Sequence, residues 1–130
     1  MRRLAIAVTA TVLTLTLFVP TASAEPKSPS VDQIKAYAKT YVLANGGHPV
    51  TGKGAARQWG CFAKVIHYES RWNHKAQNGI HYGLGQLASS KASHDGKPYL
   101  QVRDTWKYMV KRYPDKACGA WDHIVWIGWY

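Results

Sequence analysis

The sequence predicts a predominantly helical α+β domain. Hydrophobic residues recur at intervals of three and four over four segments, which is the pattern of one buried helical face. Residues 74–99 lack this repeat and are rich in His, Asn, Gly, Tyr and Ser, which favours loops and a short hairpin. The length of 130 residues, with 46% hydrophobic residues, 6 Trp and 8 Tyr, suits one domain with one core. A multidomain enzyme and a disordered chain are excluded.

The first 24 residues have the three parts of a secretory signal peptide. Arg2 and Arg3 supply positive charge, residues 4–19 form the apolar stretch, and Ala-Ser-Ala at 22–24 is a small-residue cleavage site. A membrane anchor is the alternative, but this stretch is shorter than the roughly twenty apolar residues that cross a bilayer, and it contains threonines. We expect cleavage before Glu25 and a secreted mature chain.

The chain has two cysteines, Cys61 and Cys118, which lie 57 positions apart. An exported protein meets an oxidising environment, so the pair predicts one disulfide. Two buried free thiols are the alternative. A bridge that closes so long a loop constrains the unfolded chain strongly, which matters in a small domain.

Without the signal peptide the chain carries 15 Lys and Arg against 7 acidic residues, a net charge of +8. Such an excess favours polyanionic partners, namely wall polymers, anionic lipid headgroups or nucleic acid, but it also serves solubility. The sequence contains no nucleic-acid-binding motif and no amphipathic basic helix. Charge alone therefore does not choose the partner.

The first helix is predicted over residues 31–44, after a flexible segment at 25–30. Ser30 and Gln33 form a capping-box pattern at its start. Its hydrophobic repeat consists of Val31, Ile34, Ala38, Tyr41 and Val42. Residues 46–54 are rich in glycine and predict a loop.

The second helix is predicted from Ala55 to about Trp72. Its apolar face consists of Trp59, Phe62, Ala63 and Ile66. Extending this face by three residues reaches Glu69, the only glutamate in the mature chain besides Glu25. A carboxyl at an apolar edge loses hydration, which raises its pKa and lets it act as a general acid near neutral pH.

A boundary glutamate in an ordinary ion pair is the alternative interpretation of Glu69. Its candidate partners are Arg57, Arg71 and Lys75. A nearby cation would favour the charged carboxylate and remove the reason for an acid role. The sequence leaves both interpretations open.

Within residues 74–99 we expect loops, a short hairpin and at most one brief helix. Tyr82 is followed by Gly-Leu-Gly-Gln at residues 83–86. Two glycines permit close approach of the backbone to a ligand, and Gln86 can both donate and accept hydrogen bonds. The segment also fits a tight turn, and it lacks the features of a phosphate-binding loop.

Two more helices are predicted, over residues 100–113 and 117–127. Pro114 ends the first and Gly128 ends the second. Most of the aromatic residues near the C-terminus are expected in the core. They are Trp121, Trp126, Trp129 and Tyr130.

Three short motifs resemble those of one enzyme family. The chain has Glu-Ser at 69–70, Trp-Asn at 72–73 and Gly-Leu-Gly-Gln at 83–86. In this order they resemble the Glu-Ser and Gly-Leu-x-Gln motifs of soluble lytic transglycosylases. These are lysozyme-like enzymes that cleave the glycan of bacterial walls, and the resemblance implies a lysozyme-like fold for residues 31–130.

The C-terminal segment adds to this resemblance. Ala120, Trp121, His123 and the terminal Gly-Trp-Tyr at 128–130 are similar to the end of short secreted transglycosylase domains of actinobacteria and their phages. The family's Ala-Tyr-Asn motif is absent from the sequence. Residues 120–122 or Tyr130 must take its place.

The resemblance implies roles for individual residues. Glu69 matches the catalytic acid. The substrate-binding residues implied by the motifs and their neighbours are Ser70, Asn73, Tyr82, Gln86 and Tyr130. Peptidoglycan strands are the implied substrate and anionic wall polymers a further partner, for a monomer that is extracellular or attached to the wall. We expect no cofactor, no nucleic-acid partner and no membrane span in the mature form.

The implied reaction is cleavage between N-acetylmuramic acid and N-acetylglucosamine, with formation of 1,6-anhydromuramic ends. Most glycosidases need a second carboxylate, and the motif block contains none. If the fold places Asp95 or Asp104 opposite Glu69, the enzyme is a hydrolytic muramidase instead. A third possibility is a non-catalytic module that binds wall glycan through Trp72, Tyr82 and Trp129.

Other chemistries find little support. The six histidines have neither short paired spacing nor the His-Glu-x-x-His pattern, so no metal is expected. A cysteine nucleophile conflicts with the expected disulfide, and a serine nucleophile lacks the Gly-x-Ser-x-Gly elbow.

Overall fold

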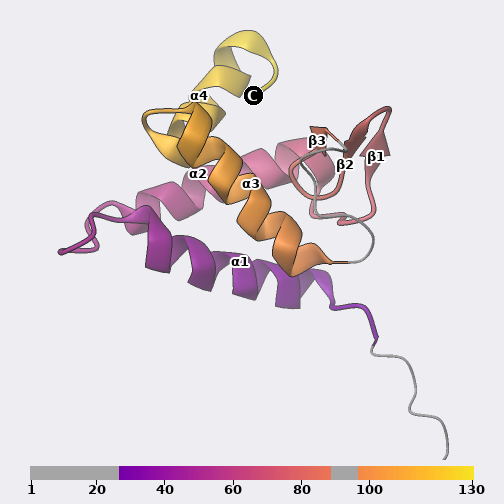
Figure 1. Ribbon diagram of the computed structural model, residues 1–130, viewed down its shortest axis with the longest axis horizontal. Coiled ribbons are helices and arrows are strands. Elements are labelled where there is room, and N and C mark those ends of the chain that lie inside the picture. Colours follow the sequence, from indigo (N-terminus) through magenta and orange to yellow (C-terminus); the bar gives the residue numbers. More distant parts are fainter. Residues whose placement is uncertain (1–26, 89–96) are drawn as a thin grey trace, which may run out of the picture.

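The computed structural model describes residues 27–88 and 97–130. Figure 1 shows that the helices make up most of this part, with a small sheet to one side near the end of α2. The predicted class, predominantly helical α+β, is confirmed. The elements are α1 (Val31–Gly46), α2 (Ala55–Ser70), β1 (Gln77–Asn78), β2 (His81–Tyr82), β3 (Leu87–Ala88), α3 (Pro98–Arg112) and α4 (Lys116–Ile127).

The predicted signal peptide and the first two residues of the segment at 25–30 lie outside the described residues. Among the residues that are described, none of the helices combines the length and the hydropathy that a membrane span requires.

The predicted capping box begins α1. The Ser30 hydroxyl accepts a hydrogen bond from the backbone N–H of Gln33, and the Gln33 side chain accepts one from the N–H of Ser30. The helix continues two residues beyond the predicted end, to Gly46. A Cβ atom on Gly46 would lie 3.0 Å from the Cβ of Gln58, so this glycine allows α1 to approach α2 closely.

The second helix ends at Ser70, two residues earlier than predicted. Arg71 and Trp72 have φ angles of 50° and 65°, in the left-handed region, and the N–H of Arg71 donates to the carbonyl of His67. This reversal turns the Trp72 side chain into the core, where it is 4% exposed. A saccharide contact through Trp72, as the binding-module hypothesis requires, is therefore wrong.

The predicted hairpin is part of a three-stranded antiparallel sheet of order β1-β2-β3. Gln77 pairs with Tyr82, and His81 pairs with Ala88. Within residues 74–88 no helix forms, and residues 89–96, where a brief helix was also possible, lie outside the description.

The last two helices are close to their predicted bounds. The third begins at Pro98, two residues early, because proline fits the first turn of a helix. The fourth ends at Ile127, and Gly128, with φ 93°, stops it as predicted. However, Trp126 is 84% exposed and Trp129 is 52% exposed, so the expectation that most C-terminal aromatics are core residues is wrong for these two.

The core lies between the four helices. Helix α2 packs against α1 and α4, and α3 packs against the same two helices. Phe62 and Trp106 meet edge to face, with ring centroids 6.1 Å apart, and so join α2 to α3. The fully buried members include Ile34, Ala38, Val42, Phe62, Val65, Ile66, Leu84, Val102, Met109, Ala117 and Ala120.

Three interactions fix α4 on α2. The predicted disulfide joins Cys61 to Cys118, whose Cα atoms are 4.9 Å apart. The buried Gln58 side chain accepts a hydrogen bond from the N–H of Ala117 (3.0 Å) and donates to the carboxylate of Asp115 (3.0 Å). Since α4 has no side-chain N-cap of its own, Gln58 satisfies one of its first N–H groups.

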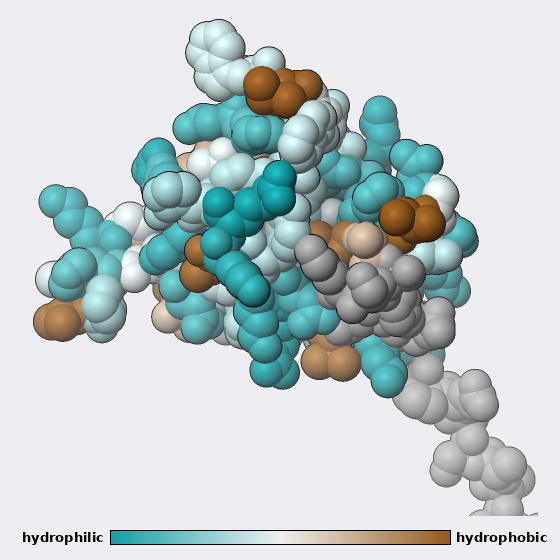
Figure 2. Space-filling view, turned by 45° about the horizontal axis from the view of Figure 1, so that its top comes forward, coloured by the Kyte–Doolittle hydropathy of each residue, from teal (hydrophilic) through white to brown (hydrophobic). Residues whose placement is uncertain are grey.

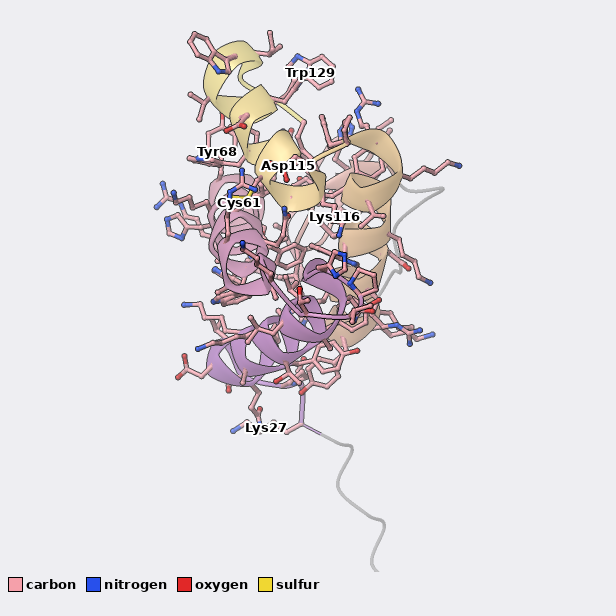
Figure 3. The ribbon with its side chains drawn as sticks, turned by 90° about the vertical axis from the view of Figure 1, so that its left-hand side faces the viewer. Lys27, Cys61, Tyr68, Asp115, Lys116 and Trp129 are labelled. Carbon is pink, nitrogen blue, oxygen red and sulfur yellow. A yellow bond between two sulfur atoms is a disulfide. The ribbon has the colours of Figure 1, made fainter. Side chains whose placement is uncertain are left out.

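The third interaction is a two-point ion pair. The guanidinium of Arg57 donates to both carboxylate oxygens of Asp115, at 3.1 and 2.7 Å, and holds the pKa of Asp115 below its usual value. Figure 3 shows Cys61 and Asp115 at this junction of α2 with α4.

We predict that Cys61→Ala/Cys118→Ala lowers the free energy of unfolding by about 4 kcal/mol, since the bridge closes a long loop in the unfolded chain. Urea unfolding of the oxidised protein and the variant measures the difference. Reduced wild type should behave like the variant. Equal stability of all three samples would contradict the prediction.

Candidate active site around Glu69

Glu69 lies in the last turn of α2, on the helical face that continues from the buried Val65 and Ile66. Its side chain is half-buried, and burial raises its pKa from the ordinary 4.5 to about 7. The C-terminal end of a helix carries partial negative charge, which also disfavours a carboxylate there. The carboxyl is therefore protonated in a large share of molecules at neutral pH.

The ion-pair interpretation of Glu69 is not supported by the structure. Arg57 pairs with Asp115 instead. Glu69 makes no ion pair with any residue that the structure describes, Arg71 and Lys75 included. Burial is the cause of its raised pKa, and no cation in the described part of the chain opposes this shift.

Residues 83–86 form a turn that packs against α3 and is hydrogen-bonded to it. The side-chain oxygen of Gln101 accepts a hydrogen bond from the N–H of Leu84 at 2.9 Å, and its amide donates to the carbonyl of His74 at 3.0 Å. Gln101 is only 5% exposed. One buried side chain thus ties the turn to the segment that follows α2.

The two glycines of this turn are required by α3. A Cβ atom on Gly83 would lie 2.5 Å from the side-chain oxygen of Gln101, and one on Gly85 would lie 2.3 Å from the hydroxyl of Thr105. Gly83 also has a φ of 74°. The close approach that the sequence predicted for a ligand is therefore made to side chains of the protein itself.

Tyr130 reaches this turn from the end of the chain. Its hydroxyl donates to the carbonyl of Gly85, and its ring meets that of Tyr108 edge to face, with centroids 5.6 Å apart. Burial raises the pKa of Tyr130 well above its ordinary value, and the charge of Glu69 raises it further. Tyr130 therefore contacts Gly85 and lies within range of the charge of Glu69.

Of the two replacements considered for the Ala-Tyr-Asn motif, Tyr130 is the one that contacts the turn. Residues 120–122 face elsewhere. Ala120 is in the core, and Trp121 lies under the ammonium group of Lys64, which is 5.6 Å from its ring centroid.

The side chains of the other predicted substrate-binding residues form hydrogen bonds to other groups of the protein. The buried Ser70 hydroxyl donates to the carbonyl of Ile66 (3.1 Å), and the side-chain oxygen of Asn73 accepts from the N–H of Lys75 (3.0 Å). The Tyr82 hydroxyl accepts a hydrogen bond from the side-chain amide of Gln77 (3.0 Å).

Gln86 contributes to the turn in the same way. Its side-chain amide donates to the carbonyls of Ala76 (3.1 Å) and Gly83 (2.8 Å). The structure thus brings the turn and Tyr130 to Glu69, while Asn73 stays exposed on the segment after α2. These internal bonds give Gln86 and Ser70 a structural function whatever they contact in a complex.

Sequence reasoning missed two residues that build the site, Gln101 and Thr105. Both are polar residues on the buried stripe of α3, with exposures of 5% and 1%. This position was the available signal, because a buried polar side chain needs a hydrogen-bond partner from another element.

No grouping of three or more His, Cys, Asp or Glu suited to a metal ion occurs in the described part of the chain. Comparison of the chain with protein-family models, with curated proteins and with solved structures finds no match. The resemblance to transglycosylases therefore rests on the motifs at residues 69–73, 83–86 and 118–130.

We predict that the Glu69 carboxyl titrates near pH 7. Glu25 and Glu69 are the only glutamates, so carboxyl-carbon NMR of protein labelled at glutamate shows two signals, of which Glu69→Gln removes one. A midpoint for that signal near 4 would contradict the pKa of about 7.

The same shift predicts a stability difference. The folded state binds the Glu69 proton more tightly than the unfolded state, so this contribution is full below about pH 4 and is lost as pH rises through 7. Glu69→Gln should therefore be more stable than wild type at pH 9, by about 1–2 kcal/mol because solvent screens a half-exposed carboxyl, and equally stable at pH 4. Urea unfolding at both pH values tests this difference.

We also predict that Gln101→Leu destabilises the protein by about 2 kcal/mol, because the buried N–H of Leu84 loses its acceptor. Hydrogen exchange at Leu84 should accelerate as well. Gln77→Leu, at an exposed glutamine, is the control and should change stability little. Unchanged exchange at Leu84 in the Gln101 variant would contradict the prediction.

Proposed function

We propose that the protein is a secreted lytic transglycosylase that cleaves peptidoglycan between N-acetylmuramic acid and N-acetylglucosamine. The observation that carries this proposal is the Glu69 carboxyl, which is half-buried, has no cationic partner in the described chain and has a pKa of about 7. Such a group donates a proton near neutral pH. The turn of residues 83–86 beside it matches the second motif of the family.

In the proposed reaction, Glu69 donates its proton to the glycosidic oxygen. The bond from this oxygen to C1 of the muramic acid then breaks through an oxocarbenium-like state. The acetamido oxygen of the same sugar stabilises the positive charge, so no protein carboxylate is needed as nucleophile. The other product leaves as a free hydroxyl.

The second step returns the proton. The Glu69 carboxylate takes the proton of the C6 hydroxyl, and O6 forms a bond to C1. This closes a 1,6-anhydro ring and restores protonated Glu69 without consuming water. Its half-buried setting supports this cycle, because a pKa near the working pH makes the carboxyl both a fair acid and a fair base.

A hydrolytic muramidase would need a second carboxylate near Glu69. A close carboxylate would itself raise the pKa of Glu69, but burial is the cause of its raised pKa. Asp104 lies on α3 in a groove with Lys107 and Lys111, and Asp95 lies outside the described residues. In the described part of the chain no second carboxylate contributes to the raised pKa of Glu69, which supports the mechanism with one carboxylate.

A lysozyme-like fold is part of the proposal. A helix that ends in the acid beside a small antiparallel sheet, with the other helices packed around it, is the arrangement that the resemblance implies. The disulfide between Cys61 and Cys118 supports export to an oxidising compartment. Of the aromatics named for a pure binding module, Trp72 is unavailable, which weakens that alternative.

We predict that Glu69→Gln abolishes release of soluble muropeptides from purified sacculi while the protein stays folded. Mass spectrometry of the wild-type products should show anhydro ends, which are lighter than hydrolysed ends by one water. Asp122→Asn removes one exposed carboxylate from α4 and is the matched control, with full activity expected.

The outcomes separate the hypotheses. Full activity of Glu69→Gln would end the proposal. Hydrolysed ends in the wild-type products would assign a muramidase, and binding to sacculi without any product would assign a glycan-binding module.

A further inference from the structure

A groove of about 560 Å³ runs along the outer face of α3. It is lined by Leu87, Asp104, Lys107, Tyr108, Lys111 and Arg112. All but Leu87 lie on α3 at helical spacing, so they form one continuous wall. Figure 2 shows strongly hydrophilic side chains gathered over the middle of this side of the molecule.

The groove carries three cations and one carboxylate, so its net charge is positive. Lys107 and Lys111 are exposed and lie one turn apart on α3. Two ammonium groups at this spacing repel each other, which an anion between them relieves. The groove therefore suits a ligand that carries negative charge.

The side chain of Arg112 is oriented by contacts with neighbouring aromatic residues. Its guanidinium carbon lies 5.8 Å from the ring centroid of Tyr108 and 5.5 Å from that of Trp129, and its Nε donates to the Tyr113 hydroxyl at 3.2 Å. Such stacking orients a guanidinium without neutralising it. Its remaining N–H groups can still bind an anion.

The groove borders the turn of residues 83–86 through two of its lining residues. Tyr108 lines the groove and packs edge to face on Tyr130, whose hydroxyl bonds to Gly85. Leu87, at the other wall, directly follows the turn of residues 83–86. A ligand in the groove would therefore lie next to the Tyr130 ring and the turn that it contacts.

We propose that this groove binds a negatively charged substituent of the glycan strand that is cut at Glu69. The inference rests on the proposed function and adds a substrate preference to it: strands that bear anions are favoured over neutral glycan. Two substituents supply this chemistry, the carboxylates of peptide stems and the phosphodiesters of polymers attached to the wall. Both bind Lys and Arg through charge-assisted hydrogen bonds.

The test measures binding rather than cleavage, in the background of Glu69→Gln. Co-sedimentation is carried out with three insoluble polymers: Gram-positive walls with their phosphate polymers, the same walls stripped of these polymers with hydrofluoric acid, and chitin, which is uncharged. The variant Lys107→Gln/Lys111→Gln leaves the stacking of Arg112 intact. A second variant adds Arg112→Gln.

The matched control is Lys39→Gln/Lys53→Gln, which removes the same charge from exposed lysines on other elements. Lys27→Gln, at the end of the molecule opposite Trp129 (Figure 3), is added to match the triple variant. Circular dichroism confirms that each variant is folded.

We expect the triple groove variant to bind anionic walls roughly tenfold more weakly at low salt, and the controls to stay within about twofold of the parent. The difference should vanish at high salt, where charges are screened. Loss that disappears on stripped walls identifies phosphate as the anion, and loss that persists there identifies carboxylate.

Groove and control variants that bind equally would overturn the inference, and so would equal binding of the parent protein to chitin and to walls. Failure of the proposed function has a different signature. If the wild type releases no product but the groove variants still bind walls more weakly, the proposed enzyme activity is contradicted and the anion-binding site is retained.

Discussion

The junction between α2 and α4 is the constraint on which the site depends. The disulfide, the capping of α4 by Gln58 and the two-point pairing of Arg57 with Asp115 all act within the first turns of α4. They fix the position where α4 starts. The direction of α4 across α2 then determines where the last residue of the chain lies. Tyr130, at that end, contacts the turn beside Glu69. The contacts at the start of α4 therefore help to determine which residues surround the Glu69 carboxyl.

A second set of contacts fixes the turn itself. Gly83 and Gly85 lie against Gln101 and Thr105 so closely that neither position has room for a side chain. The turn thus rests on α3, and the same helix presents Lys107 and its neighbours on its outer face. One helix positions the turn on its buried stripe and offers cations on its exposed stripe. Helical periodicity alone links the two surfaces.

The local features of the fold were predictable from sequence, because local chemistry determines them. The capping box of Ser30 and the stop at Gly128 are examples. The end of α2 was not, since tertiary contact draws Trp72 into the core through left-handed residues that no local signal marks. The position of Glu69 followed from the apolar repeat, but its neighbours Gln101 and Tyr130 depend on packing between elements distant in sequence.

The distribution of charge reconciles a strongly cationic protein with an acid that keeps its proton. A cation within about 4–6 Å of Glu69 would favour its carboxylate and lower its pKa. Among the residues that the structure describes, none contributes to its shift; Arg57 is engaged with Asp115, and Lys107 and Lys111 line the groove on α3. The positive charge can then attract an anionic partner over the distance that salt permits, while burial controls the carboxyl at short range. The attraction of an anionic partner and the pKa of Glu69 are determined by different residues, so one can change without loss of the other.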